Sequence, residues 1–87
     1  MNSFFEELGD AFAAAAHEQG ITLEPPRLDE AVAAELLDFS RLVAHSTERR
    51  FAPLSTYLAG LATAGVGADR ALEMLQTVRA KLESPIG

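Results

Sequence analysis

The sequence predicts an all-α protein folded as a compact four-helix bundle. Apolar residues recur at intervals of three and four residues in four segments, which is the spacing of an amphipathic helix. No segment alternates apolar and polar residues as a half-buried strand would. Short stretches with Gly or Pro separate the segments. We therefore expect one domain over residues 1–87, with helices at about 3–19, 28–47, 53–64 and 68–83.

The first helical segment has a start signal and a stop signal. Ser3 is followed three residues later by Glu6, which is the pattern of a capping box. Gly20 is a natural residue for the C-terminal stop. Between them the apolar residues keep helical spacing, at Phe5, Leu8, Phe12 and Ala15.

The second segment begins after Pro25 and Pro26, because neither residue can lie inside a continuous helix. Its main apolar stripe consists of Leu28, Val32, Leu36, Phe39 and Val43. Leu37 and Leu42 widen this stripe beyond what a surface helix needs. Either two neighbouring helices pack on this one, or it also serves an oligomer interface. The acidic residues Glu30, Glu35 and Asp38 are expected to form a solvated surface.

The third segment carries no charged residue, and a helix that is apolar nearly all round is usually buried. Pro53 suits its first position. Gly60 costs helix stability relative to Ala, so we expect close packing against a neighbour to compensate. The small residues that would allow this approach are Ala59, Gly60, Thr63 and Ala64.

The fourth segment follows a turn at Gly65 and Gly67. Residues 84–87 are expected to form a tail beyond it. Its predicted core stripe is Ala71, Leu75, Val78 and Leu82.

Composition excludes several classes of protein. The hydrophobic share of 48% and the charged share of 23% are those of an ordinary globular domain. Without cysteine there can be no disulfide, thiolate metal site or thiol catalysis. The N-terminus does not resemble a signal peptide, and the longest apolar run, residues 11–16, is too short to span a bilayer. We therefore expect a cytoplasmic protein that does not bind membranes.

The net charge of −6 is unevenly distributed. Residues 1–40 contain nine acidic residues and one basic residue, Arg27, whereas residues 41–87 contain four acidic and six basic residues. Overall acidity argues against binding of nucleic acid, which requires a cationic surface. The asymmetry indicates either attraction between the two halves of a bundle or a local site for an anion or a partner in the second half.

No catalytic or metal-binding pattern is present. His17 and His45 lie in different helical segments, and neither has acidic residues at the spacing of a metal site. Serine and threonine residues occur without the arrangement of a catalytic triad, and no phosphate-binding glycine motif follows a strand. We therefore expect no enzymatic activity, no metal and no cofactor.

A basic cluster near residue 45 is the main candidate site. Arg41, His45 and Arg49 recur every four residues, so a helix would place them on one face. The start of the third helix follows soon after, and a helix N-terminus favours anions. The candidate site for an anion or a partner consists of Arg41, His45, Arg49, Arg50, Ser55 and Thr56. Alternatively, Arg41 pairs with Asp38, Arg49 and Arg50 are solvated, and Ser55 only completes the helix start.

Aromatic and aliphatic residues suggest a candidate interface. Tyr57 is the only tyrosine, and together with Phe51 it could anchor a partner or a second copy of the chain. Alternatively, Tyr57 belongs to the core with its hydroxyl group at the rim. The candidate interface residues are Leu37, Phe51 and Tyr57.

The stretch 42–60 carries a more specific pattern. Val43-Ala44-His45 is followed by Arg49, by Ala52-Pro53 and by Thr56-Tyr57-Leu58, and it ends at Gly60. This pattern resembles that of a family of small actinobacterial helical domains of unknown function (DUF6457-like). These domains occur alone or at the C-terminus of molybdenum cofactor guanylyltransferases. The chain differs from the usual family pattern at Arg50 and Phe51, where the family has proline and a small residue.

The resemblance implies a role in molybdenum cofactor maturation without catalysis. The chain would be a binding or adaptor module, and its partner would be a molybdenum cofactor guanylyltransferase or a maturation factor for molybdenum enzymes. As motif positions, His45 and Arg49 would bind that partner or an anionic cofactor, or would tie the second helix to the third. The alternatives are a structural domain that homodimerises through the second helix, and a small-anion binder unrelated to molybdenum.

Overall fold

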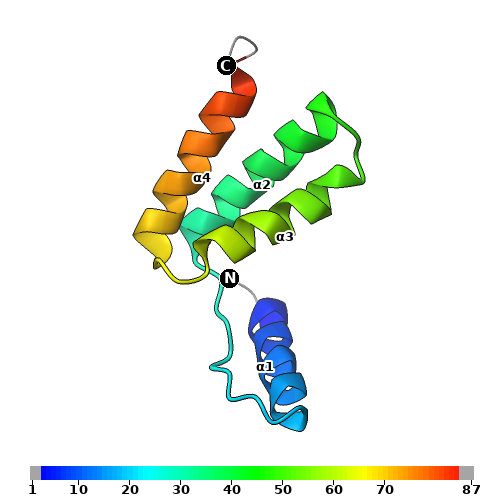
Figure 1. The fold of residues 1–87 in the computed structure, drawn as a ribbon, viewed down its shortest axis with the longest axis vertical. Coiled ribbons are helices and arrows are strands. Elements are labelled where there is room, and N and C mark those ends of the chain that lie inside the picture. Colours follow the sequence, from blue (N-terminus) through cyan, green and yellow to red (C-terminus); the bar gives the residue numbers. More distant parts are fainter. Residues whose placement is uncertain (1–2, 85–87) are drawn as a thin grey trace. The chain divides into compact units, whose positions relative to one another are not determined.

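The computed structural model describes residues 3–84, and these residues form four α-helices and no strand (Figure 1). This confirms the predicted all-α fold class with four helices. The chain divides into two units, Met1–Glu30 and Ala31–Gly87. Of the predicted tail, residues 85–87 lie outside the described residues. The helices are α1 (Ser3–Glu18), α2 (Glu30–Ser46), α3 (Phe51–Thr63) and α4 (Ala68–Glu83).

In the first unit, α1 ends at Glu18, one residue before the predicted end, and Gly20 forms the predicted C-terminal stop. Gly20 has a φ of 77°, a left-handed conformation that glycine adopts without steric cost. The N–H of Ile21 donates to the carbonyl of Ala16, and the N–H of Gly20 donates to the carbonyl of His17, each over 2.9 Å. These two bonds satisfy carbonyls that the end of a helix would otherwise leave free.

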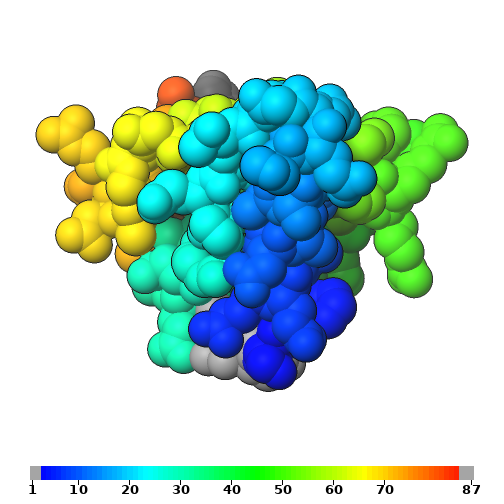
Figure 2. All heavy atoms as spheres, turned by 90° about the horizontal axis from the view of Figure 1, so that it is seen from below, coloured from blue at the N-terminus to red at the C-terminus, as the bar shows by residue number. Residues whose placement is uncertain are grey.

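The segment after α1 folds back along this helix, and in the space-filling view the cyan segment lies against the blue helix (Figure 2). Arg27 donates to the Asp10 carboxylate at 2.8 Å and to the carbonyl of Glu6 at 3.4 Å. Gly9 is buried at this contact. A Cβ atom at this position would collide with the carbonyl oxygen of Pro26. The absence of a side chain at Gly9 therefore allows the close approach.

The second unit contains α2, α3 and α4 (Figure 1), and side chains from all three helices form a small core. This core consists of Phe39 and Val43 from α2, Ala52 from α3, and Ala71 and Leu75 from α4. The predicted stripes are thus confirmed for the last two residues of the α2 stripe, Phe39 and Val43, and for the first two of the α4 stripe, Ala71 and Leu75. The outer members of the α4 stripe, Val78 and Leu82, are 45% and 48% exposed.

Helix α2 is shorter than predicted at both ends. It begins at Glu30, directly after Asp29, and aspartate is favoured at the position before a helix because it can accept from free N–H groups. At the other end the Ser46 hydroxyl donates to the carbonyl of Leu42 at 2.8 Å, and the Thr47 hydroxyl donates to the carbonyl of Val43 at 2.6 Å. Hydroxyl groups that bond to nearby carbonyls in this way compete with the helical pattern.

Helix α3 begins at Phe51, two residues before the predicted start at Pro53. The N–H of Phe51 donates to the carbonyl of Glu48 at 2.9 Å, and a tight turn therefore leads directly into the helix. Pro53 is the third helical residue. Proline is tolerated there because the first four N–H groups of a helix have no acceptor within it.

The prediction that α3 is buried is wrong. Its large apolar side chains point outward and are 60–70% exposed, namely Leu54, Tyr57, Leu58 and Leu61. The opposite side carries small residues: Ala52 is buried, and Ser55, Thr56, Ala59 and Thr63 are half-buried. The helix therefore turns its small residues toward α2 and α4, and these four large side chains remain mostly exposed.

Two of the glycines expected to matter near α3, Gly60 and Gly67, differ in their surroundings. Gly60 is exposed, and a Cβ atom there would meet nothing within 4 Å, so the expected close packing at Gly60 is wrong. Gly67 precedes α4 with φ 82° and ψ 163°, a conformation that is essentially restricted to glycine. The predicted turn at Gly67 is confirmed.

Candidate functional site

An open pocket lies where α2 ends and the chain turns into α3. It is lined by Leu37, Ser40, Arg41, Ala44, His45, Arg49 and Ala52. Arg41 and His45 are one helical turn apart on α2, and Arg49 follows in the turn before α3. The structure thus brings together half of the predicted basic cluster, together with the predicted interface residue Leu37.

The basic groups in this pocket differ in what they contact. Arg41 is paired with Asp38 at 3.1 Å, as the alternative interpretation of the sequence had it, and both side chains are more than half exposed. Such a pair contributes about 0–1 kcal/mol. The side chains of His45 and Arg49 make no hydrogen bond or ion pair with any residue between 3 and 84. These two groups are the hydrogen-bond donors that a partner could recruit.

The other half of the predicted cluster is placed elsewhere. The Arg50 side chain pairs with Glu48 at 3.3 Å and lies 5.8 Å from the centre of the Phe51 ring. The Thr56 hydroxyl donates to the carbonyl of Pro53 at 2.9 Å. Ser55, which is the fifth residue of α3, lines a different and apolar groove. The six predicted residues therefore do not surround a single anion.

The apolar groove runs between α3 and α4, with α2 as its floor, and has a volume of about 500 Å³. Phe39 and Val43 of α2 lie at the floor. The walls are large apolar side chains of α3 and α4, among them Phe51, Leu54, Leu58, Met74, Val78 and Leu82. The few hydroxyl groups in the lining include those of Thr47 and Thr63, and each donates to the carbonyl four residues earlier in the chain. The groove therefore offers contact area and little hydrogen-bonding capacity.

The three predicted interface residues lie on different surfaces. Leu37 is 66% exposed beside the basic pocket, and Phe51 is 37% exposed in the apolar groove. Tyr57 is 70% exposed on the outer side of α3, so its alternative placement in the core is wrong. The physical reason is the rotation of α3, which points its small residues inward.

The whole described chain matches a known family. The profile of the family described as "Domain of unknown function (DUF6457)" covers residues 3–85. The chain belongs to the DUF6457 family. No curated protein and no solved structure shows significant similarity to it. The match extends over all four helices, whereas the pattern found in the sequence was limited to residues 42–60.

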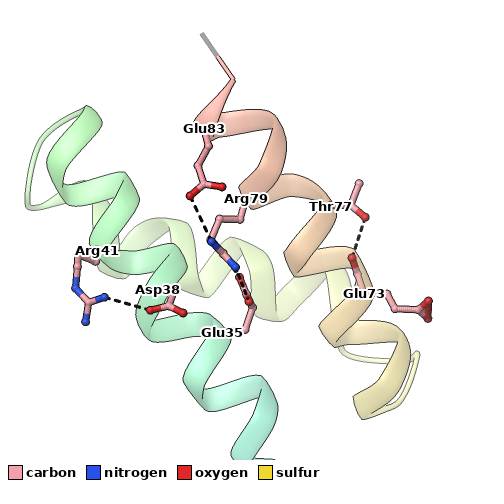
Figure 3. A network of polar contacts seen from close by, with 7 residues as sticks. All are labelled: Glu35, Asp38, Arg41, Glu73, Thr77, Arg79 and Glu83. Carbon is pink, nitrogen blue, oxygen red and sulfur yellow. Dashed lines mark hydrogen bonds and ion pairs between the residues drawn. The ribbon is translucent and has the colours of Figure 1, made fainter.

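One ion pair of this DUF6457 domain was missed from the sequence (Figure 3). Glu35, expected on a solvated surface, is buried with 6% exposure and binds Arg79 of α4 through both carboxylate oxygens. Arg79 also reaches Glu83 at 3.4 Å. The hydrogen bond to Glu35 raises the pKa of Arg79 above its ordinary value. The signal was available, because Glu35 lies three residues after Val32 and four before Phe39, at the edge of the apolar stripe.

Over residues 3–84, no three His, Asp or Glu side chains converge as a metal site would require. None of the helices in this range is both long and apolar enough to cross a bilayer. The features that remain are surfaces, namely the basic pocket, the apolar groove and the outer side of α3.

Proposed function

We propose that this DUF6457 domain is a non-catalytic adaptor that binds a protein partner through the pocket at the α2–α3 junction. The proposal rests on one observation. The side chains of His45 and Arg49 form no hydrogen bond or ion pair within the described chain, and they lie next to the exposed Leu37. Arginine is enriched among the residues that dominate binding energy at protein interfaces. Leu37 adds an apolar contact. The fitting partner surface has a carboxylate that faces Arg49 and an apolar side chain that faces Leu37.

The partner we propose is a component of molybdenum cofactor maturation, either a molybdenum cofactor guanylyltransferase or a maturation factor for molybdenum enzymes. This part rests on the resemblance of residues 42–60 to actinobacterial domains that occur fused to such guanylyltransferases. The motif residues His45 and Arg49 lie in the pocket, which supports their use as contacts. On this proposal the chain binds the partner in the cytoplasm and contributes no catalytic group.

Calorimetric titration of the full chain with the purified guanylyltransferase of the same organism tests the proposal. We expect Arg49→Ala to weaken binding by at least about tenfold, since a bidentate contact to a carboxylate is lost. Arg70→Ala is the matched control, because Arg70 is also exposed but lies in the first turn of α4. If the wild-type chain does not bind, the guanylyltransferase is rejected as the partner. If both variants weaken binding equally, the pocket is not the site.

A second candidate function is the binding of a small anion in the same pocket. It is supported by the convergence of Arg41, His45 and Arg49. It is weakened by the ion pair between Arg41 and Asp38, which already neutralises one of the three groups. Titration with inorganic phosphate and with a guanine nucleotide distinguishes the two functions. Binding with a millimolar or lower dissociation constant that Arg49→Ala abolishes would favour the function as an anion binder. Heat changes equal to those of buffer would exclude the anion and favour the function as a protein adaptor.

A further inference from the structure

We infer that α3 and the groove beside it form the interface of a homodimer, in which the ridge of one copy occupies the groove of the other. This inference is independent of the proposed adaptor function, because it uses a different surface and a different partner. The ridge consists of the four outward side chains of α3, Leu54, Tyr57, Leu58 and Leu61. The groove is the apolar groove between α3 and α4.

The orientation of α3 is the first argument. An amphipathic helix normally turns its large apolar residues toward the core. Here Ala52 is buried while Leu58 is 67% exposed and Tyr57 is 70% exposed. The hydroxyls of Thr56 and Thr63 on the inner side donate to carbonyls within α3. The outer side is the one that needs a cover.

The shape of the surface indicates what the cover is. Leu54 and Leu58 belong to the ridge and also line the groove, so convex and concave apolar surfaces lie side by side on one face. A two-fold axis places the same patch of both copies together, and residue i of one copy then meets residue j of the other in both directions. A patch that carries both a ridge and a groove can pair with an identical patch, because the ridge of each copy then fits into the groove of the other. The pairing also closes at two copies.

The available area matches that of a dimer interface. Beside the four ridge residues, the groove contributes Phe51, Met74, Val78 and Leu82, which are 37–48% exposed. At roughly 100 Å² of exposed area for each side chain, these eight residues supply about 800 Å² per copy. A standard interface buries about 800 Å² per partner, and monomers rarely expose a contiguous apolar patch of more than a few hundred Å².

The lack of charge on α3 favours a second copy of the chain over a charged partner at this surface. The chain carries a net charge of −6, so two copies repel each other unless they meet on an uncharged surface. α3 has no charged residue, whereas each of the other three helices carries at least three acidic residues. The outer side of α3 therefore contributes no acidic group to the interface, and the side chains that α4 contributes, Met74, Val78 and Leu82, are apolar.

Sedimentation equilibrium of the full chain, from about 1 µM to about 200 µM, tests the inference. We expect a mass of twice the 9.3 kDa of one chain at the upper concentrations. Leu58→Glu places a charge in the centre of the interface and is expected to give a monomer. Leu37→Glu is the matched control, because Leu37 is 66% exposed on α2 and the dimer is expected to persist. Circular dichroism checks that both variants keep their helices.

The single tyrosine provides a second measurement that does not require a variant. Because the chain has one Tyr and no Trp, its ultraviolet emission reports on Tyr57 alone. We expect acrylamide to quench Tyr57 several-fold less in the dimer than after dilution to the monomer. A monomer at all concentrations overturns the inference. In that case an accessible Tyr57 means that the face stays bare, and a protected Tyr57 means that the chain covers it itself. A dimer that Leu58→Glu preserves, or that Leu37→Glu dissociates, also overturns it.

Discussion

Two glycines inside helices, Gly9 and Gly60, are predicted to respond to alanine in opposite directions. Gly60→Ala is expected to stabilise the protein by up to about 1 kcal/mol, because alanine is the better helix former and a Cβ atom there meets nothing within 4 Å. Gly9→Ala is expected to destabilise it by about 1–3 kcal/mol, because the new methyl group collides with the Pro26 carbonyl and lies 2.8 Å from the Arg27 guanidinium.

Urea denaturation followed by circular dichroism gives both free energies of unfolding. The two variants control for each other, since each makes the same exchange within a helix and only the surroundings differ. Equal stabilisation by both substitutions would show that the segment around Pro26 does not hold the close contact with α1.

The sequence predicts residues well where the backbone alone determines the role. Gly20 was recognisable because only glycine ends a helix in a left-handed conformation without cost, and its φ is 77°. Gly9 was not recognisable, because its role depends on a segment seventeen residues later that returns to it. Glu35 was misplaced for the same reason, since its partner Arg79 lies forty-four residues away. Periodicity places a residue on a face but does not say what lies opposite.

The link between α2 and α4 is predicted to be the most sensitive ion pair of the described chain. Arg79→Ala leaves the Glu35 carboxylate buried without a partner, and the melting temperature is expected to fall on the order of 10 °C. The matched control is Arg41→Ala, which removes an arginine paired to an exposed acid and should change the melting temperature by only a few degrees at most.

Differential scanning calorimetry measures both changes. The double variant Glu35→Leu with Arg79→Leu tests the cause, because replacing a buried pair with apolar residues removes the unpaired charge and often restores stability. If the double variant is as unstable as Arg79→Ala, packing of the arginine side chain matters more than its charge.

The approach of α3 to its neighbours is predicted to depend on small side chains. Ala52 is 7% exposed on the inner side of α3, and Ala52→Leu is expected to cost about 1–3 kcal/mol because the larger side chain forces the helices apart. Ala62→Leu is the control, since Ala62 is exposed in the wall of the open groove. Urea denaturation of both variants should show a loss only for Ala52→Leu. An equal loss for Ala62→Leu would mean that the groove is filled.

At the level of elements, sequence periodicity located all four helices but not the orientation of α3. An uncharged, apolar helix predicts burial because such helices are usually surrounded. In α3 both sides are uncharged, so the hydropathy pattern cannot distinguish the inner side around Ala52 from the outer side around Leu58. Packing decides between them through size, and the small residues allow the closer approach. The candidate pocket could be predicted in part from the sequence, because the spacing of Arg41 and His45 alone places them on one face of α2.

The whole molecule carries its excess charge in one part of the sequence. Residues 1–30 contain seven acidic residues and one basic residue, whereas residues 31–87 contain six of each. Two copies that pair through α3 therefore join two nearly neutral units while the acidic residues 1–30 of the copies repel each other. Binding of the protein partner at Arg49 depends instead on attraction between opposite charges. The two associations are therefore expected to respond to salt in opposite directions.

Raising sodium chloride from about 0.1 M to about 1 M shortens the screening length from about 10 Å to about 3 Å. The homodimer is expected to tighten several-fold, because screening weakens the repulsion and leaves apolar contacts intact. Binding of the protein partner is expected to weaken, because the attraction between Arg49 and a carboxylate is screened. Sedimentation equilibrium and calorimetric titration in the two buffers measure the two affinities. A dimer that weakens with salt would show that ion pairs hold the copies together, and this would contradict an interface built from the apolar side chains of α3 and the groove.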